Sequence, residues 1–182
     1  MSKRTILVVD LQNDYFPTGK LPLVGIEGAV DNAARVIAAA RASGGGVIHI
    51  RHEFTQRDAP FFALGSQGAE IHPSVRPIEG EPIIVKNHAN SFRGTELKGL
   101  LDAKGIEDVL IVGAMSHMCI DATTRAAADF GYKATVLHDA CATRNLEFGG
   151  RVVPAAEVHA AFMAALASSY ASVVATSAYL AR

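Results

Sequence analysis

The 182-residue chain lacks a charge excess, a set of cysteines and a long hydrophobic run. Its formal net charge of −1 provides neither the basic surface that nucleic acid binds nor a polybasic patch for anionic lipid. Two cysteines, Cys119 and Cys141, are too few for a disulfide framework. No apolar stretch is long enough to span a bilayer, and no signal-peptide pattern opens the chain. We therefore expect a cytoplasmic protein that binds neither nucleic acid nor membrane.

Internal repeats and low-complexity segments are also missing. A hydrophobic content of 49% beside 19% charged residues is typical of a globular protein. A chain of this length can bury a substantial core, and no linker divides it. We expect one domain over residues 1–182.

Short apolar segments alternate with segments of helical periodicity along the chain. The expected strands are 5–9, 47–50, 82–85, 108–112, 134–137 and 172–175, and the expected helices are 27–42, 95–104, 116–130 and 155–168. Strands that are apolar throughout belong in a parallel sheet with helices on both faces. The pattern predicts an α/β fold, a doubly wound (Rossmann-like) three-layer sandwich with a six-stranded, mostly parallel sheet. Residues 53–82 lack periodicity and are expected to form a long irregular loop.

Cys119 stands where a β-branched run that ends at Gly113 gives way to an alanine-rich helical pattern. Ser116 could cap this helix and leave Cys119 near its first turn. Free N–H groups and the positive end of the helix dipole would favour a thiolate there. Such a thiolate could be a nucleophile for acyl transfer, although a lone cysteine can equally be a small buried hydrophobe.

Two further polar residues follow strands of the predicted sheet, Asp10 after 5–9 and Lys86 after 82–85. Sites of doubly wound folds lie at the carboxyl ends of the strands, so we expect Asp10, Lys86 and Cys119 to meet at one edge. Asp10 could then take the thiol proton, and the Lys86 ammonium could stabilise the adjacent negative charge. Taken singly, Asp10 could be a turn residue and Lys86 a solvated charge; the agreement of three positions favours catalysis.

The same segments resemble the isochorismatase-like cysteine hydrolases, which include nicotinamidases, N-carbamoylsarcosine amidases, ureidoacrylate amidases and isochorismatases. Residues 10–16, DLQNDYF, resemble the D-x-Q-x-D-F signature that opens members of this family. Lys86 after a short apolar strand matches the family lysine, and residues 113–119, GAMSHMC, resemble its nucleophile segment. The resemblance spans nearly the whole chain.

This resemblance implies a role for each residue: Asp10 is the general base, Lys86 the electrostatic partner and Cys119 the nucleophile that forms an acyl-enzyme. It also implies a cis peptide bond between Ala114 and Met115, which would aim the backbone N–H groups of Met115 and Cys119 at the substrate oxyanion. The implied partners are a small-molecule substrate and further copies of the chain, in a dimer or tetramer, and no cofactor is expected.

The sequence departs from the nicotinamidase pattern at the metal ligands. Nicotinamidases carry D-x-H where this chain has His52, Glu53 and Phe54, so we expect neither a metal nor nicotinamidase activity. A site built from His49, His52 and His72 is conceivable because imidazole binds zinc, but the usual ligand spacing is missing. Hydrogen-bonded histidines at a strand end are the simpler interpretation.

Four residues near these motifs are candidates for substrate contact. Phe16 adjoins the signature, and Phe92 could extend an apolar wall. His117 lies two residues before the nucleophile, and Asn87 follows Lys86. Each also has a structural interpretation, such as core packing for the rings and capping or a subunit contact for His117.

The presence of Cys119 together with Asp10 and Lys86 favours hydrolysis of an amide or ureido C–N bond in a small molecule. An isochorismatase-type vinyl ether hydrolase is an alternative, but that reaction protonates carbon, and specialised members often lack the cysteine. A binding or redox-sensing protein on the same scaffold and a thiol peroxidase are further alternatives.

Overall fold

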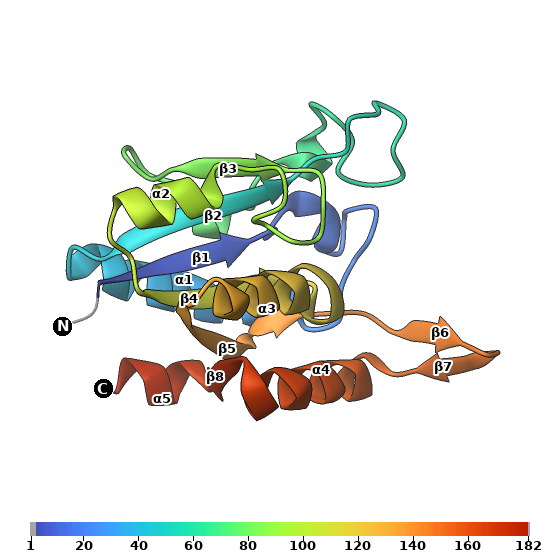
Figure 1. Cartoon of the computed structure of the whole chain (residues 1–182). Coiled ribbons are helices and arrows are strands. Elements are labelled where there is room, and N and C mark those ends of the chain that lie inside the picture. Colours follow the sequence, from blue (N-terminus) through green and yellow to red (C-terminus); the bar gives the residue numbers. More distant parts are fainter. Residues whose placement is uncertain (1–2, 182) are drawn as a thin grey trace.

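Six short strands form one sheet in which every neighbouring pair runs parallel, as the computed structural model of the protein shows for residues 3–181 (Figure 1). The strand order is β3-β2-β1-β4-β5-β8. These strands are β1 (Arg4–Val9), β2 (Gly46–His52), β3 (Ile83–Lys86), β4 (Asp108–Ala114), β5 (Lys133–Ala142) and β8 (Ala171–Val174). The strand order reverses between β1 and β4, which makes this pair the switch point of a doubly wound sheet.

Helices cover both faces of the sheet, so the predicted three-layer α/β sandwich is confirmed. They are α1 (Ile26–Ala42), α2 (Leu97–Ala103), α3 (Asp121–Asp129), α4 (Ala155–Ser169) and α5 (Thr176–Leu180). Helix α1 packs in one core layer together with Tyr179 of α5, whereas α2, α3 and α4 contribute to the other layer. Alternate residues of β1 pack into the two core layers: Ile6 and Val8 lie in the first, and Leu7 and Val9 lie in the second. This division explains why the strand is apolar throughout.

The predicted helix over 116–130 is wrong at its start. Residues Ser116–Ile120 form a π-helical turn, and α3 follows only from Asp121. Ser116 does not cap a helix, because its hydroxyl lies against the Ala142 carbonyl and Nδ1 of His159 instead. The sequence pattern shows periodicity but not the extra residue that a π-turn inserts.

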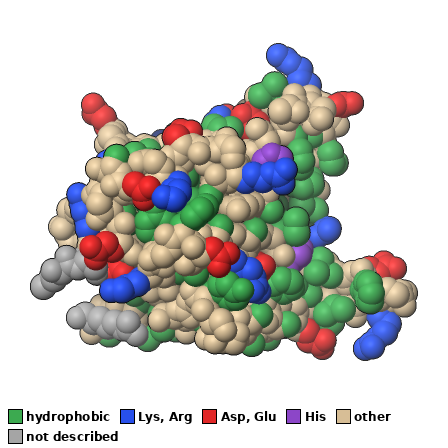
Figure 2. All heavy atoms as spheres, viewed as in Figure 1, with side chains coloured by type: hydrophobic (Ala, Val, Ile, Leu, Met, Phe, Trp, Pro, Cys, Tyr) green, Lys and Arg blue, Asp and Glu red, His purple; other side chains and the backbone are tan. Residues whose placement is uncertain are grey.

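Two elements at the end of the chain were not expected, namely α5 and a hairpin of β6 (Leu146–Phe148) and β7 (Arg151–Val153). The hairpin projects from the body of the protein (Figure 1), and hydrophobic side chains gather on it (Figure 2). Phe148 is 87% exposed and Val152 is 65% exposed. Strands of three residues are too short for periodicity to reveal.

Residues 53–82 are irregular, as predicted, apart from two short 3₁₀ turns at Gln67–Ala69 and Pro73–Val75. A third 3₁₀ turn, Asn13–Tyr15, follows β1. Over residues 3–181, every helix is too short or too polar to cross a membrane.

Gly113 allows the two central strands to approach closely at the carboxyl edge of the sheet. It pairs in register with Val9 and has a φ of 132°. Residues other than glycine rarely adopt this backbone conformation. A Cβ at this position would lie 1.9 Å from the Val9 carbonyl oxygen. The residues that follow β1 and β4 can therefore lie side by side only because position 113 has no side chain.

We expect Gly113→Ala to lower the free energy of unfolding by about 3 kcal/mol or more, because backbone strain adds to a steric overlap with backbone atoms. Urea denaturation followed by circular dichroism measures this change. Gly28→Ala is the control, since a Cβ at Gly28 in α1 would have no atom within 4 Å. That control should stabilise the protein by up to about 1 kcal/mol. Equal effects of the two substitutions would contradict the packing assigned to Gly113.

Candidate active site

Three residues from three different strand ends meet at the carboxyl edge of the sheet, as the sequence predicts. Asp10 follows β1, Lys86 is the last residue of β3, and Cys119 lies in the π-turn after β4. The Lys86 Nζ atom lies 2.8 Å from Asp10 Oδ2 and 3.2 Å from Cys119 Sγ. One ammonium thus contacts both the carboxylate and the sulfur.

Asp10 occupies its place through an unusual backbone conformation. Its φ is 53°, in the left-handed region that aspartate tolerates better than most residues. Its N–H donates to the Ile50 carbonyl of β2 (3.0 Å), and its own carbonyl accepts the Gln12 N–H (2.9 Å). The chain therefore leaves the strand at Asp10 while its backbone stays bound to the sheet.

Burial makes the charges of the site interdependent. Asp10, Lys86 and Cys119 are 0%, 1% and 4% exposed, respectively. Burial disfavours the charged form of Lys86, but Asp10 and Cys119 outweigh it and raise the pKa of the ammonium overall. Lys86 also donates to the His88 carbonyl (3.0 Å) and contacts Nδ1 of His52 at 3.1 Å. Its charge is stable in the interior because these groups replace water.

The surroundings of Cys119 favour the thiol, in contrast to the expectation that a helix dipole favours a thiolate there. Burial first, and then the negative charge of Asp10, raise the pKa of Cys119 well above its usual value, although Lys86 opposes them. The sulfur lies in a π-turn, not at the start of a regular α-helix. Activation therefore requires a proton acceptor at the sulfur, and the Asp10 carboxylate is within 4.8 Å.

His52 is a fourth member of the cluster, although the sequence suggested for it only a metal ligand or a hydrogen-bonded histidine at a strand end. It is the last residue of β2, the strand between β1 and β3. Burial lowers its pKa to about 4; Asp10 raises the pKa and Lys86 lowers it, but both effects are smaller than that of burial. The ring is therefore neutral at neutral pH. Its place at a strand end, like those of Asp10 and Lys86, was the available signal.

Gln12 and Asp14 of the signature segment hold the surrounding chain and do not contact the sulfur. The Gln12 amide donates to the carbonyls of His52 (2.8 Å) and Ala69 (2.7 Å), and its oxygen accepts the His52 N–H (2.8 Å). Asp14 accepts the Phe62 N–H at 2.6 Å. The polar residues that follow Asp10 thus fasten β2 and the irregular 53–82 loop to the edge where the site lies.

The peptide bond between Ala114 and Met115 is cis, as expected. The Met115 carbonyl accepts the N–H groups of Met118 (3.0 Å) and Ile120 (3.2 Å). The Met115 N–H, in contrast, has no acceptor among residues 3–181. A free donor thus lies on the segment that carries the nucleophile candidate.

Comparisons with known proteins agree with this geometry. The isochorismatase domain family matches residues 4–178. The chain belongs to the isochorismatase family. It is 48% identical to YddQ, an uncharacterized isochorismatase family protein of Bacillus subtilis, over 96% of this chain and 97% of that protein. It is 30% identical to maleamate amidohydrolase of Pseudomonas putida, over 79% of this chain and 74% of that protein.

Among solved structures, the fold is similar to a protein from Oleispira antarctica that is assigned to the isochorismatase hydrolases. The TM-score is 0.96 at 53% sequence identity, and the match covers 100% of this chain and 97% of the other. The protein is accordingly an isochorismatase-family hydrolase.

The two aromatic candidates for substrate contact in this hydrolase pack against other rings. Phe16 is stacked on His72, with centroids 3.7 Å apart and planes 13° apart. Phe92 packs edge-on against Phe130 and parallel to Tyr132. Within residues 3–181, no ring contact joins Phe16 or Phe92 to His52, whose ring lies near Phe54 and Phe62. Phe92 does pack in the same hydrophobic layer as Cys119.

The two polar candidates also have partners elsewhere. Nδ1 of His117 lies 2.6 Å from the Thr143 hydroxyl, and the Asn87 amide donates to the Glu53 carbonyl. Neither side chain forms a hydrogen bond with Asp10, Lys86 or Cys119 in the described part of the chain. Substrate contact by His117 or Asn87 therefore stays a prediction.

The three histidines considered as metal ligands are separated by their partners. Nε2 of His49 binds Glu81 at 2.9 Å, His72 stacks on Phe16, and His52 contacts Lys86. The ligand set imagined from the sequence is therefore not assembled.

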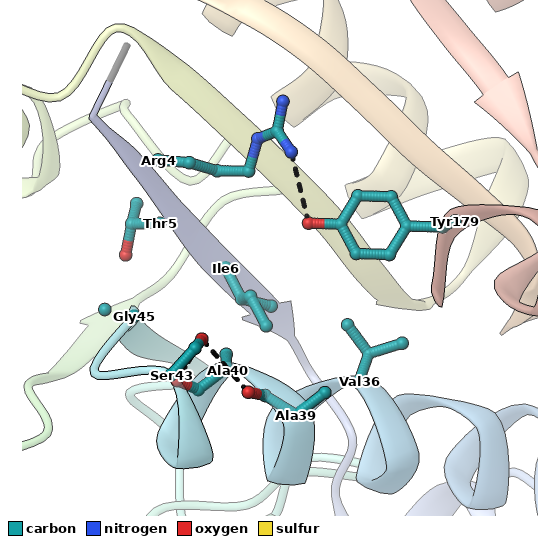
Figure 3. Close-up of a pocket in the computed structure, with 10 residues that line it drawn as sticks. Arg4, Thr5, Ile6, Val36, Ala39, Ala40, Ser43, Gly45 and Tyr179 are labelled. Carbon is teal, nitrogen blue, oxygen red and sulfur yellow. Dashed lines mark hydrogen bonds between the residues drawn. The ribbon is translucent and has the colours of Figure 1, made fainter. Parts of the chain in front are cut away.

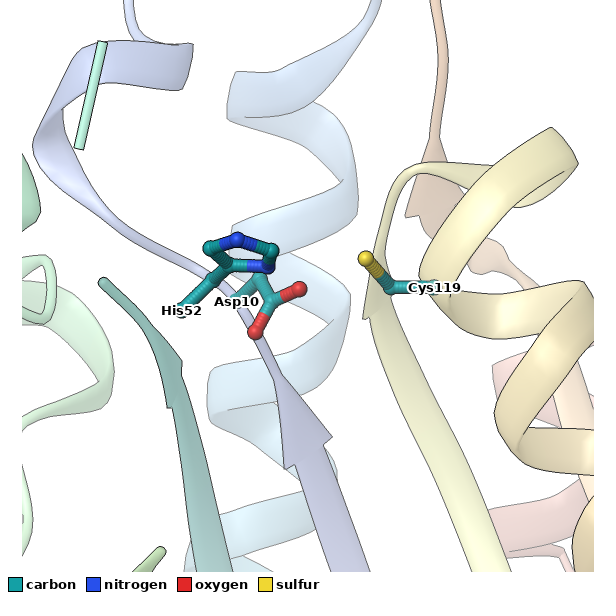
Figure 4. Close-up of side chains that lie close together, drawn as sticks. All are labelled: Asp10, His52 and Cys119. Atoms are coloured by element: carbon teal, nitrogen blue, oxygen red, sulfur yellow. The ribbon is translucent and has the colours of Figure 1, made fainter. Parts of the chain in front are cut away.

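A different group, Asp10, His52 and Cys119, brings its donor atoms within 4.8 Å of one another (Figure 4). All three contact Lys86 Nζ, at 2.8, 3.1 and 3.2 Å respectively. One ammonium thus contacts all three donor groups.

A separate cavity of about 210 Å³ opens at the opposite edge of the sheet (Figure 3). Its lining includes Arg4 and Ile6 of β1, Val36 of α1 and Tyr179 of α5. Arg4 donates to the Tyr179 hydroxyl at 3.3 Å. Because the cavity lies at the amino ends of β1 and β2, it is not part of the site around Cys119.

The electrostatics of the cluster predict opposite effects of two substitutions on alkylation of Cys119. Asp10→Asn removes a negative charge that raises the pKa of the thiol, so iodoacetamide should react faster at about pH 10, where hydroxide can take the thiol proton in place of Asp10. Lys86→Gln removes a charge that lowers this pKa, so the reaction at the same pH should slow. Second-order rates measure both effects, and circular dichroism verifies folding. A slower reaction of folded Asp10→Asn at this pH would contradict the assigned influence of Asp10.

Proposed function

We propose that this isochorismatase-family hydrolase cleaves a C–N bond of a small amide or ureido compound through a thioester on Cys119. Asp10 is the base in this proposal, and Lys86 is the electrostatic partner. The observation that carries it is the position of Lys86 Nζ, in contact with both Asp10 Oδ2 (2.8 Å) and Cys119 Sγ (3.2 Å). The relationship to maleamate amidohydrolase supports an amide as the substrate class.

The first step is transfer of the thiol proton from Cys119 to Asp10. Before transfer the negative charge is on the carboxylate, and afterwards it is on the sulfur. Because the Lys86 ammonium contacts both atoms, the buried site contains one paired positive and one paired negative charge in either state. Transfer therefore does not create an unpaired charge in the interior, and a thiol with a raised pKa can still react.

The thiolate then attacks the carbonyl carbon of the substrate, and the carbonyl oxygen acquires the negative charge. The Met115 N–H has no other acceptor in the described structure, and we assign it to this oxyanion together with the Cys119 N–H. One such donor contributes a factor of about 10²–10³ in rate. Asp10 returns its proton to the leaving nitrogen, and the C–N bond breaks to give the thioester and a free amine or ammonia.

Water completes the cycle. Asp10 accepts a proton from the attacking water, the resulting tetrahedral intermediate expels the sulfur, and the acid product leaves. Cys119 regains the proton from Asp10, so every group returns to its starting state. The near-complete burial of the three side chains favours a small substrate, because little room surrounds the sulfur.

Replacement of the nucleophile tests the proposal. In a panel of small primary amides and ureido compounds, the wild-type protein should release ammonia from at least one member, and Cys119→Ala should release none above background. Cys141→Ala is the matched control, because this second buried cysteine lies in β5, in register with Gly113, and has no role in the reaction. It should retain activity.

Asp10→Asn should lower turnover of the same substrate by about 10²–10⁴, the usual contribution of a positioned base. Ammonia release that persists in Cys119→Ala would exclude the thioester route. Hydrolysis of a vinyl ether that survives the same substitution would favour the isochorismatase-type alternative.

We also propose that the protein is a homo-oligomer in which the β6–β7 hairpin contacts a second copy. The exposed hydrophobic side chains of Phe148 and Val152 support a contact between copies. Two isolated strands of three residues gain little stability from packing against each other, so a partner surface would stabilise the hairpin. Light scattering after gel filtration should give a dimer or tetramer, and Phe148→Asp should shift it toward monomer. Glu147→Gln on the opposite face of β6 is the control, and a monomeric wild type would contradict the proposal.

A further inference from the structure

One nitrogen of the His52 ring has a partner in the cluster and the other has none. Nδ1 lies 3.1 Å from Lys86 Nζ. An ammonium has hydrogen atoms to donate and no lone pair to accept, so Nδ1 is the acceptor in this contact. A neutral imidazole carries a single N–H, and here it must therefore be on Nε2. Lys86 thus determines the tautomer of His52.

The Nε2–H group is buried and donates to no acceptor within residues 3–181. The His52 residue as a whole is 9% exposed. Buried N–H groups without a partner are rare in native proteins, and those in active sites are commonly satisfied by a substrate or a bound water. The orphaned donor belongs to a ring that has a nitrogen within 4.8 Å of both the Asp10 carboxylate and the Cys119 sulfur.

The ring has little freedom to turn this donor elsewhere. Gln12 holds the backbone of His52 through two hydrogen bonds of 2.8 Å, one to its carbonyl and one from its N–H. The rings of Phe54 and Phe62 flank the imidazole, with centroids at 4.9 and 6.0 Å. In Figure 4 the imidazole lies beside the Asp10 carboxylate, and the Cys119 side chain lies across from both.

We propose that the Nε2–H of His52 donates a hydrogen bond to a second oxygen of the bound substrate, one carried by the atom next to the reacting carbon, and thereby selects small molecules that have such an oxygen. This inference deepens the proposed function and rests on it for the identity of the substrate class. A substrate without that oxygen leaves a buried donor unpaired, and the site discriminates against it for this reason.

Two substitutions distinguish the role of the Nε2–H donor from the role of the contact between Nδ1 and Lys86. In His52→Asn the amide can supply an acceptor near the position of Nδ1, but it does not reach the position of Nε2. In His52→Gln the longer amide can supply a donor near Nε2. The first variant loses the proposed substrate contact, and the second retains it.

Alkylation of Cys119 measures the contact without a known substrate. Iodoacetamide carries a carbonyl oxygen beside its reactive carbon, whereas allyl iodide has the same leaving group and similar size but no oxygen. We expect the ratio of the iodoacetamide rate to the allyl iodide rate to fall about 10-fold in His52→Asn, the usual effect of one lost hydrogen bond. The ratio should stay within about twofold of wild type in His52→Gln. Equal slowing by both reagents in His52→Asn, or an unchanged ratio, would overturn the proposal.

The tautomer of His52 in the unaltered protein provides a second measurement. It tests whether the Nε2–H donor that the proposal requires is present, even if His52→Asn fails to fold. In protein labelled with ¹⁵N-histidine, the long-range ¹H–¹⁵N spectrum at pH 7 should show His52 protonated at Nε2 alone. Its signal is identified by its loss in His52→Gln. Protonation at Nδ1, or at both nitrogens, would overturn the proposal.

The outcomes distinguish this proposal from the proposed function. If no amide is hydrolysed in a Cys119-dependent manner but the rate ratio responds to His52→Asn, the oxygen contact stands and the amidase proposal fails. If hydrolysis depends on Cys119 but the ratio does not respond, the amidase proposal stands and the role of His52 fails.

Discussion

The Lys86 ammonium is the interaction on which the site depends. It lies in the protein interior, and its charge is stabilised there by Asp10, by the sulfur of Cys119 and by two uncharged acceptors, the His88 carbonyl and the His52 ring. A buried cation of this kind persists only where its neighbours replace water. The proposed reaction uses Asp10 and Cys119 among these neighbours, so the contacts that stabilise the buried charge are also the contacts that the proposal needs for reactivity.

The sheet brings these groups together by its topology and by one close contact. The strand order reverses between β1 and β4, and Gly113 lets these two strands lie against each other where Asp10 and the Cys119 turn begin. Gln12 then fastens the end of β2, and with it His52, to the same edge. Each catalytic candidate is carried by a different strand end, and the backbone hydrogen bonds of the sheet limit their relative movement.

Charge balance explains why Cys119 rests as a thiol although a cation touches it. The Asp10 carboxylate lies within 4.8 Å of the sulfur, and a second negative charge beside it in a buried site is unfavourable. In the proposed mechanism the thiol therefore keeps its proton until the proton passes to Asp10. Burial also keeps His52 neutral, which leaves its second nitrogen as a hydrogen-bond donor beside two charged residues.

The order of apolar strands and helices was sufficient to predict the α/β sandwich and the meeting of Asp10, Lys86 and Cys119, because parallel strands place their carboxyl ends at one edge whatever their side chains. Local pattern could not reveal the π-turn at Ser116, the β6–β7 hairpin, or the rings against which Phe16 and Phe92 stack. The state of Cys119 and the tautomer of His52 were also decided only in three dimensions. Both depend on burial and on charged residues that lie far away along the chain. Neither the burial nor the proximity of these charges exists until the strands are assembled.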